Sequence, residues 1–436
     1  MWLRALAEAM AALRERLPRP LSVEAAACTG QMHGTVLSAR GGAVGPAILW
    51  ADRRAAAEAR RLQAVLGAAR YRAVTGAPAS PNHLGPQLLW LSAAAPRAVA
   101  SAEAAFLPKD WVRWRLGGDP VTDPTDASGT GLFDLSARHW SAPLREALGA
   151  AARLLPAVVA APAAAGRLSP SGARILGLPA GLPLVAGAGD LPAAVFGAGA
   201  GDGQAVLHVG SAGQAAVVTP VPPGGVGPRP PGGQAFCHPE DGREIAVRPL
   251  LAAGLAARWA ADLLGRSAAP PPEVVPPLLF LPQVAGERGG ARAPAPQGAW
   301  LGLGLETGPD DMLAAVLHGV AMAFREALEA LGPVPERPLL LAGEAFAPDW
   351  AARMASVLDR EVDLAELPAP SAAGAALLAA AGSGAGSMRT RPPRRPVAPV
   401  AAATERLQAL YAAYRRARAP VAAAGRALER LRPPSA

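Results

Sequence analysis

The sequence predicts a mixed α/β protein built from two domains. At 436 residues the chain is long enough for two hydrophobic cores. Short aliphatic runs at residues 184–186 and 205–209 are typical of buried strands, whereas residues 312–331 repeat their apolar side chains at helical spacing. Strand-like and helix-like segments follow one another along the chain, which favours an α/β architecture.

The composition mainly excludes classes of partner. Apolar residues make up 51% of the chain, enough for sizeable cores, although alanine inflates the figure. Lys109 is the only lysine, and arginine supplies the other strong bases behind the net charge of +8. Because the arginines are scattered and lack interleaved aromatic residues, we expect no nucleic-acid partner.

Cysteine and histidine usage predicts no structural metal site. Cys28 and Cys237 lie far apart, and neither they nor the six dispersed histidines match a metal-binding or redox spacing. Two cysteines without a secretory leader predict a cytoplasmic location. No uninterrupted apolar run reaches membrane-spanning length, so we expect no membrane partner.

Apolar periodicity and turn residues predict the remaining elements. We expect helices at residues 1–17, 84–91, 106–116, 250–264, 312–331, 350–358 and 404–416. We expect strands at residues 23–29, 184–186, 205–209, 278–282 and 339–341, with loops at 220–233, 268–277 and 382–396. In the helix at 250–264, the stripe expected to face one side comprises Leu251, Leu255, Trp259 and Leu263.

The stretch at residues 182–218 organises the functional interpretation. Asp190 follows the first aliphatic run, and the turn Gly210-Ser211-Ala212-Gly213 follows the second. Glycine-rich turns can close around phosphate oxygens, and an acid beside such a turn can take the proton of an attacking hydroxyl. The alternative is a hairpin corner with a solvated aspartate, and this stretch alone favours that alternative.

A second turn, Gly30-Gln31-Met32-His33-Gly34, suits a small polyol. Gln31 and His33 can form hydrogen bonds with hydroxyls, and Met32 can pack on a carbon face. Taken alone, His33 is better explained as a turn histidine. Asp52 either caps the helix that follows it or contacts the substrate.

Two further segments carry open alternatives. Residues 122–130 are polar and rich in turn formers, so they form either a solvated loop or one wall of a sugar pocket. The strand at 339–341 leads into a turn and a helix, which places Gly343 where a nucleotide can rest against the backbone.

Together these landmarks resemble the FGGY carbohydrate kinases from about residue 2 to residue 414. The matching stretches keep the order and spacing of the family. They are residues 30–34, 48–53, 107–110, 122–134, 189–190, 210–213, 236–238, 280–288 and 298–319.

The resemblance implies an α/β, two-domain, ribonuclease-H-like fold of the sugar kinase and actin type. It implies a sugar-binding domain at residues 1–200 and an ATP-binding domain at 201–436. It also implies that ATP, with Mg²⁺, phosphorylates a hydroxyl of a ketose such as D-xylulose. The expected partners are therefore a small-molecule sugar and ATP, and a homodimer is left open.

By position the resemblance also assigns roles to single residues. Asp190 matches the general base. The sugar side comprises Gln31, Met32, His33 and Asp52. The nucleotide side comprises Gly210, Ser211 and Gly213 in a phosphate loop and Gly343 in an adenosine-side turn.

The chain departs from the family pattern at several positions. Leu191 replaces the asparagine that usually follows the catalytic aspartate, which removes a sugar hydrogen bond. Ser211-Ala212 replaces Thr-Ser, Phe346 stands in the adenosine-side turn, and His318 stands where an acid is typical.

The printed sequence begins after the strand with an Asp-x-Gly-Thr turn that opens family members. We therefore expect an N-terminally truncated first domain with exposed apolar edges, caused by a start site assigned too late or by a degraded gene. Three hypotheses follow: a ketose kinase, a non-catalytic remnant that binds a sugar or a partner, and an FGGY kinase for another sugar or polyol.

Overall fold

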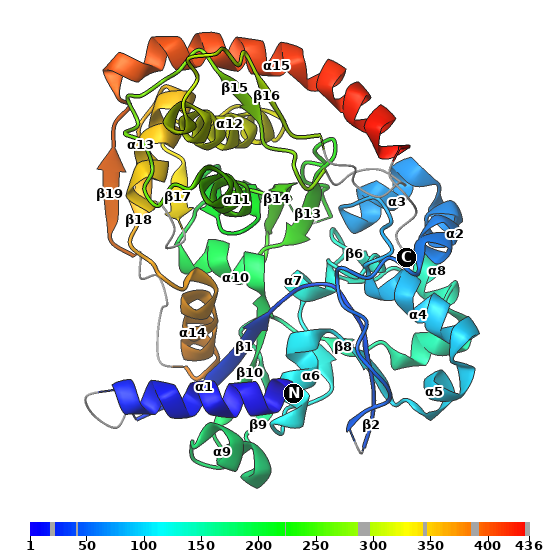
Figure 1. Cartoon of the computed structure of the whole chain (residues 1–436). Coiled ribbons are helices and arrows are strands. Elements are labelled where there is room, and N and C mark those ends of the chain that lie inside the picture. The colour runs from blue at the N-terminus through cyan, green and yellow to red at the C-terminus, as the bar shows by residue number, and fades with distance from the viewer. Residues whose placement is uncertain are drawn as a thin grey trace.

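The computed structural model describes residues 1–17, 22–40, 42–222, 224–286, 297–342, 347–384 and 392–431. Two sheets carry the architecture, a three-stranded sheet from the N-terminal half and a seven-stranded sheet from the C-terminal half. Figure 1 shows helices packed around both sheets, with α14 and α10 lying between them. Within the described ranges, no helix combines the length and apolar character needed to cross a membrane.

The first part of the chain alternates short strands with helices. Its elements are α1 (Trp2–Arg16), β1 (Ala26–Gly30), β2 (Val36–Ala39), β3 (Gly42–Ala43), α2 (Ala56–Leu66), α3 (Ala68–Thr75), α4 (Leu84–Ala94), α5 (Pro96–Ser101), β4 (Ala104–Phe106), α6 (Pro108–Arg115), β5 (Val121–Thr122), α7 (Pro124–Ala127), β6 (Phe133–Asp134), β7 (His139–Trp140), α8 (Ala142–Glu146), the 3-10 helix η1 (Gly149–Leu154), β8 (Ala157–Val158), β9 (Ala164–Arg167), α9 (Pro170–Leu176), β10 (Pro183–Gly189) and α10 (Asp190–Gly197).

The second part builds the larger sheet and the helices that cover it. Its elements are β11 (Ala205–Val209), β12 (Gly213–Pro220), β13 (Gln234–Cys237), β14 (Arg243–Leu250), α11 (Gly254–Leu264), β15 (Leu279–Leu281), β16 (Ala299–Leu301), α12 (Pro309–Glu329), β17 (Leu339–Ala342), α13 (Ala347–Leu358), β18 (Val362–Ala365), α14 (Pro370–Gly382), β19 (Arg394–Val397) and α15 (Ala401–Glu429).

The smaller sheet has the strand order β1-β10-β9. β1 and β10 run parallel, and their register pairs Ala26 with Leu184 and Gly30 with Gly189. Both strands therefore end side by side, which brings the turn after β1 next to the start of α10. Among the described residues β1 pairs with β10 alone, and all five residues of β1 are half-buried.

The larger sheet has the order β13-β14-β12-β11-β17-β18-β19. β11 and β12 form a hairpin, and β11 runs parallel to β17 with Val209 opposite Ala342. The largest core lies on this sheet and includes the buried face of α12, where Leu313, Val316, Val320, Phe324 and Leu328 are all at most 1% exposed. The helix predicted at 312–331 and its apolar stripe are confirmed.

The structure corrects four expectations about local structure. The stripe predicted for the helix at 250–264 faces solvent, because Leu255, Trp259 and Leu263 are 40–60% exposed while the alanines of α11 face the core. The segment at 122–130 is buried rather than solvated. The predicted helix at 106–116 begins only at Pro108, since Ala104–Phe106 is strand β4. The predicted loop at 382–396 contains the start of β19, and its residues 385–391 lie outside the described ranges.

Candidate active site

Asp190 opens α10 at the end of β10, where the two parallel strands finish together. Its side chain is half-buried, and its Oδ1 accepts a 2.8 Å hydrogen bond from the backbone N–H of Leu191. Its carbonyl oxygen accepts a 2.8 Å hydrogen bond from Ser371 Oγ on α14. Burial raises the pKa of Asp190 above its ordinary value, although the hydrogen bond from Leu191 opposes that rise.

Met32 lies against the backbone that carries Asp190. A Cβ added to Gly189 would come within 2.6 Å of Met32 Cγ, so the two residues are in contact. Met32 is 6% exposed and shares an apolar cluster with Leu191. The structure therefore brings the predicted sugar-side methionine to the predicted general base. Gln31 precedes it in the same turn and is half-buried.

His33 is buried and held in one orientation. Its backbone φ of 66° lies in the left-handed region, and its Nδ1 is 2.7 Å from the carbonyl oxygen of Gly129. A carbonyl only accepts, so Nδ1 carries a hydrogen in this contact. The imidazole also stacks on His83, with ring centroids 5.1 Å apart. The predicted loop at 122–130 is thus a neighbour of His33.

Asp52 has a different local role from the predicted cap. α2 begins at Ala56 with Ala55 at the cap position, so the capping prediction is wrong. The side chain of Asp52 instead accepts hydrogen bonds from the backbone N–H and the guanidinium of Arg54 at 2.8–2.9 Å. The Arg54 side chain lowers the pKa of Asp52.

The turn after β11 is exposed at its tip and is held against the start of α11. Ser211 and Ala212 are exposed, and Arg258 Nη2 on α11 donates a 2.7 Å hydrogen bond to Ser211 Oγ. The carbonyl of Gly210 accepts from the N–H of Gly254, and that of Ser211 accepts from Ala253 and Leu255. These bonds fix the turn to the start of α11.

Two further glycines were predicted to contact the nucleotide, Gly213 and Gly343. Gly213 is buried, and a Cβ added there would lie 2.6 Å from Phe324 Cζ, so this glycine allows β12 to pack closely on α12. Gly343 lies outside the described residues. Ala342 precedes it and is paired with Val209, the residue before Gly210.

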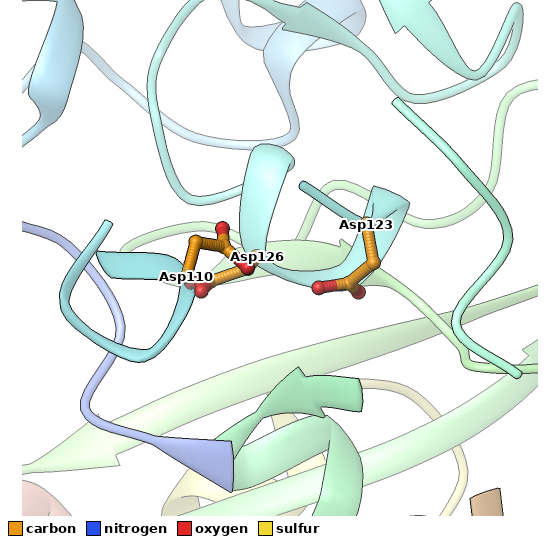
Figure 2. Close-up of side chains that lie close together, drawn as sticks. All are labelled: Asp110, Asp123 and Asp126. Carbon is orange, nitrogen blue, oxygen red and sulfur yellow. The ribbon is translucent and has the colours of Figure 1, made fainter. Parts of the chain in front are cut away.

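Sequence reasoning missed a buried ion cluster beside the strand end. Lys109 Nζ lies 2.6 Å from Asp110 Oδ1, 2.7 Å from Asp123 Oδ2 and 3.5 Å from Asp126 Oδ2. Arg113 pairs with Asp110 at 2.7 Å, and all five side chains are fully buried. Figure 2 shows the three carboxyl groups gathered between α6 and α7. The available signal was the single lysine in a chain that otherwise uses arginine.

The charges of this cluster balance when one carboxyl group is neutral. Burial raises the pKa of Asp126 well above its ordinary value, and the nearby Asp110, Asp123 and Asp190 add to that rise against the pull of Lys109. Burial would also raise the pKa of Asp110, but Lys109 and Arg113 lower it. Burial would lower the pKa of Lys109, and its acidic neighbours raise it instead. Burial and the neighbouring acids therefore favour the neutral form of Asp126.

The three carboxyl groups lie close enough to hold a metal ion, since one oxygen from each falls within 4.8 Å of the others. The Lys109 ammonium group lies at hydrogen-bonding distance from two of them and already supplies the positive charge. The residues present therefore do not fit a magnesium site at this position.

His318, which stands where an acid is expected, is buried on α12. Its Nε2 is 2.8 Å from Arg353 Nη1, which can only donate. Burial and the neighbouring Arg353 charge lower the pKa of His318 to about 3, so the ring is neutral.

Comparisons with known proteins agree with this geometry. The chain matches the model of the FGGY family of carbohydrate kinases, N-terminal domain, over residues 1–197, and the C-terminal domain model over residues 242–383. It is 32% identical to a xylulose kinase of Escherichia coli over 375 residues, which are 83% of this chain and 76% of that protein. An erythritol kinase of Brucella abortus is 29% identical over 406 residues, covering 87% of this chain and 78% of the relative.

A solved structure described as a xyloylose kinase from Brucella ovis superimposes with a TM-score of 0.79 at 28% identity. The superposition covers 98% of this chain and 88% of that structure. The two family models together span most of the sequence, and the relatives are matched over most of their length. This chain belongs to the FGGY family of carbohydrate kinases, and it is a sugar kinase.

Proposed function

We propose that this kinase transfers the γ-phosphoryl group of ATP to a hydroxyl of D-xylulose, with Asp190 as the general base. The observation that carries the proposal is the contact between Met32 and Gly189, which joins the polyol-type turn to the base. The xylulose kinase among its relatives favours D-xylulose. We also propose that residues 1–200 bind the sugar and residues 201–436 bind ATP, and that the enzyme acts in the cytoplasm.

Each residue has a chemical task in this proposal. The Asp190 carboxylate takes the proton of the sugar hydroxyl as the oxygen attacks the γ-phosphorus, and the bond between that phosphorus and the β,γ-bridging oxygen breaks. Met32 packs on the carbon skeleton, and His33 Nε2 accepts a hydrogen bond from another hydroxyl. Gln31 and Asp52 are proposed to contact further hydroxyls.

The nucleotide is proposed to lie against the turn at 210–213. The exposed Ser211 with its hydroxyl, and the Arg258 guanidinium, give this turn donors and positive charge for a phosphate tail. Gly343 is proposed to approach the adenosine. ATP, when bound, supplies the phosphoryl group, and we propose that Mg²⁺ accompanies its phosphates.

The test is ATP-dependent phosphorylation of D-xylulose by the wild-type chain and by Asp190→Asn. Removing the base is expected to lower kcat by about 10²–10⁴-fold, because that is the usual contribution of a positioned general base. Asp241→Asn is the matched control, since its side chain is 80% exposed. Wild-type turnover in Asp190→Asn would refute the assignment.

A second candidate is phosphorylation of another polyol. Leu191 is 5% exposed in the apolar cluster beside Met32, so it offers the substrate no hydrogen bond where the family resemblance leads us to expect asparagine. The erythritol kinase among the relatives points the same way. A panel of D-xylulose, D-ribulose, erythritol, glycerol and L-fuculose decides by the highest kcat/KM. A chain that binds sugar but phosphorylates none of them would favour the non-catalytic remnant.

A further inference from the structure

The hydroxyl group of Thr125 connects the buried ion cluster to the strand that carries Asp190. Thr125 Oγ1 accepts a 3.0 Å hydrogen bond from the backbone N–H of Gly189. The same hydroxyl donates a hydrogen bond to Asp123 Oδ1. Because a carboxylate only accepts, the hydroxyl hydrogen points to Asp123, which leaves its lone pairs toward Gly189. Thr125 is fully buried, so water does not compete for these bonds.

The cluster contacts the same strand at a second point. Arg113 Nη1 donates a 2.9 Å hydrogen bond to the carbonyl oxygen of Ala186 while it pairs with Asp110. Lys109 joins Asp110 to Asp123 and so links the two contacts into one network. Ala186 and Gly189 are therefore both tied to the cluster, and both lie in the second half of β10, just before the proposed base.

The backbone between these two contacts is irregular. Ala27 pairs with Val185 and Thr29 pairs with Ala188, so two residues of β10 lie opposite Cys28 alone. Gly187 within this bulge has a φ of +79°. A bulge interrupts the regular ladder of hydrogen bonds between strands. The contact from Arg113 holds the strand within that bulge, at Ala186, and the contact from Thr125 holds it just beyond, at Gly189.

We propose that Thr125, supported by the cluster of Lys109, Asp110, Arg113 and Asp123, is a positioning residue for Asp190. This inference rests on the proposed role of Asp190 as general base. None of the five side chains needs to touch the substrate. Their task is to fix the backbone from which the base projects, because a displacement of about 1 Å at a reacting group can cost about 10²-fold in rate.

The test compares Thr125→Val, which removes the hydroxyl at nearly constant volume, with Thr125→Ser, which keeps it. We expect Thr125→Val to lower kcat by about 10–100-fold with little change in the KM for the sugar. Thr125→Ser should stay within about threefold of wild type, since its hydroxyl can make both bonds. Thr75→Val is the control, because Thr75 is equally buried but its hydroxyl donates to the carbonyl oxygens of Tyr71 and Ala77 instead.

Hydrogen exchange provides a readout that does not need activity. The amides of residues 183–191 should exchange faster in Thr125→Val than in wild type and at the wild-type rate in Thr125→Ser. If Thr125→Val does not fold, as judged by circular dichroism, Thr125→Ala takes its place in both measurements.

The outcomes separate this inference from the proposed function. Wild-type kcat and wild-type exchange in Thr125→Val would overturn the positioning role even if Asp190→Asn is inactive. Equal losses in Thr125→Val and Thr125→Ser would also overturn it, because the hydroxyl would then be irrelevant. Full activity of Asp190→Asn would instead refute the general base.

Discussion

Arg258 Nη2 donates a 2.7 Å hydrogen bond to Ser211 Oγ, and this bond places an exposed guanidinium group at the turn after β11. The turn is otherwise built from backbone and one small hydroxyl. A cation held there favours an anion that approaches the exposed Ser211 and Ala212. This relationship supports the nucleotide side of the proposal.

Replacing Arg258 with glutamine should raise the KM for ATP by about fivefold, because an exposed charged hydrogen bond is worth about 1 kcal/mol. The KM for the sugar should not change, since Arg258 lies at the turn that we propose for the nucleotide. Initial rates at saturating sugar measure the effect. Arg266→Gln is the control, because Arg266 is also on the surface but pairs with Asp310. An unchanged KM for ATP would argue against phosphates at this turn.

The pH dependence of turnover should reveal Asp190. A general base works as a carboxylate, so kcat should fall as the pH decreases through the pKa of Asp190. Burial raises that pKa, so the loss should begin at higher pH than for an ordinary aspartate with a pKa of 3.8. Measuring kcat between about pH 4.5 and 8 tests this. A profile that stays flat to the acid limit of folding, or an identical acid limb in Asp190→Asn, would contradict it.

Two acids of the buried cluster, Asp110 and Asp126, should respond differently to neutralisation. Asp110→Asn leaves the charges of Lys109 and Arg113 short of a partner, and breaking a buried pair costs about 3–5 kcal/mol. Asp126→Asn should cost less, because burial and the acidic neighbours raise the pKa of Asp126 and so favour the neutral form that asparagine resembles. Urea denaturation of both variants at neutral pH measures the difference. Equal destabilisation would contradict the charge assignment.

Asp126→Asn should also change how the stability of the protein depends on pH. The pKa of Asp126 is raised in the folded protein above its value of 3.8 in the unfolded chain. Asp126 therefore contributes fully to the free energy of unfolding below pH 3.8, and this contribution is lost as the pH rises toward the folded pKa. Asparagine does not titrate. The stability of Asp126→Asn relative to wild type should therefore increase with pH above 4, by at most about 1.4 kcal/mol per pH unit. Unfolding curves at several pH values provide the check, and a constant difference would contradict the shift.

The bulge at Gly187 should not accept a side chain. A Cβ at this position would lie 2.0 Å from the carbonyl oxygen of Cys28, and the φ of +79° disfavours any L-residue with a side chain. Gly187→Ala should cost at least about 3 kcal/mol in the free energy of unfolding. Gly201→Ala is the matched control, since a Cβ there has no neighbour within 4 Å. Comparable stability of the two variants would show that β1 and β10 can separate.

Some of this molecule could be predicted from local pattern alone. The aliphatic runs at 184–186 and 205–209 lie in β10 and β11, and the stripe of α12 faces the core, because burial of apolar residues follows the period of each element. The prediction that the large apolar stripe of α11 faces the core was wrong, because side-chain size also decides which face is buried. Its leucines and tryptophan share one face, but its small alanines allow closer packing on α12, and they form the buried face.

The sequence by itself determined the fold class and the family, because these depend on residue type, order and spacing, and it proposed the chemistry-bearing residues. Only the tertiary structure decided that Met32 contacts Gly189, that Asp52 binds Arg54 rather than a helix end, and that Lys109 gathers three acids beside β10. These contacts join residues that lie far apart in the chain or depend on side-chain direction. Local periodicity does not encode them, since they follow from strand register and from the need to pair every buried charge.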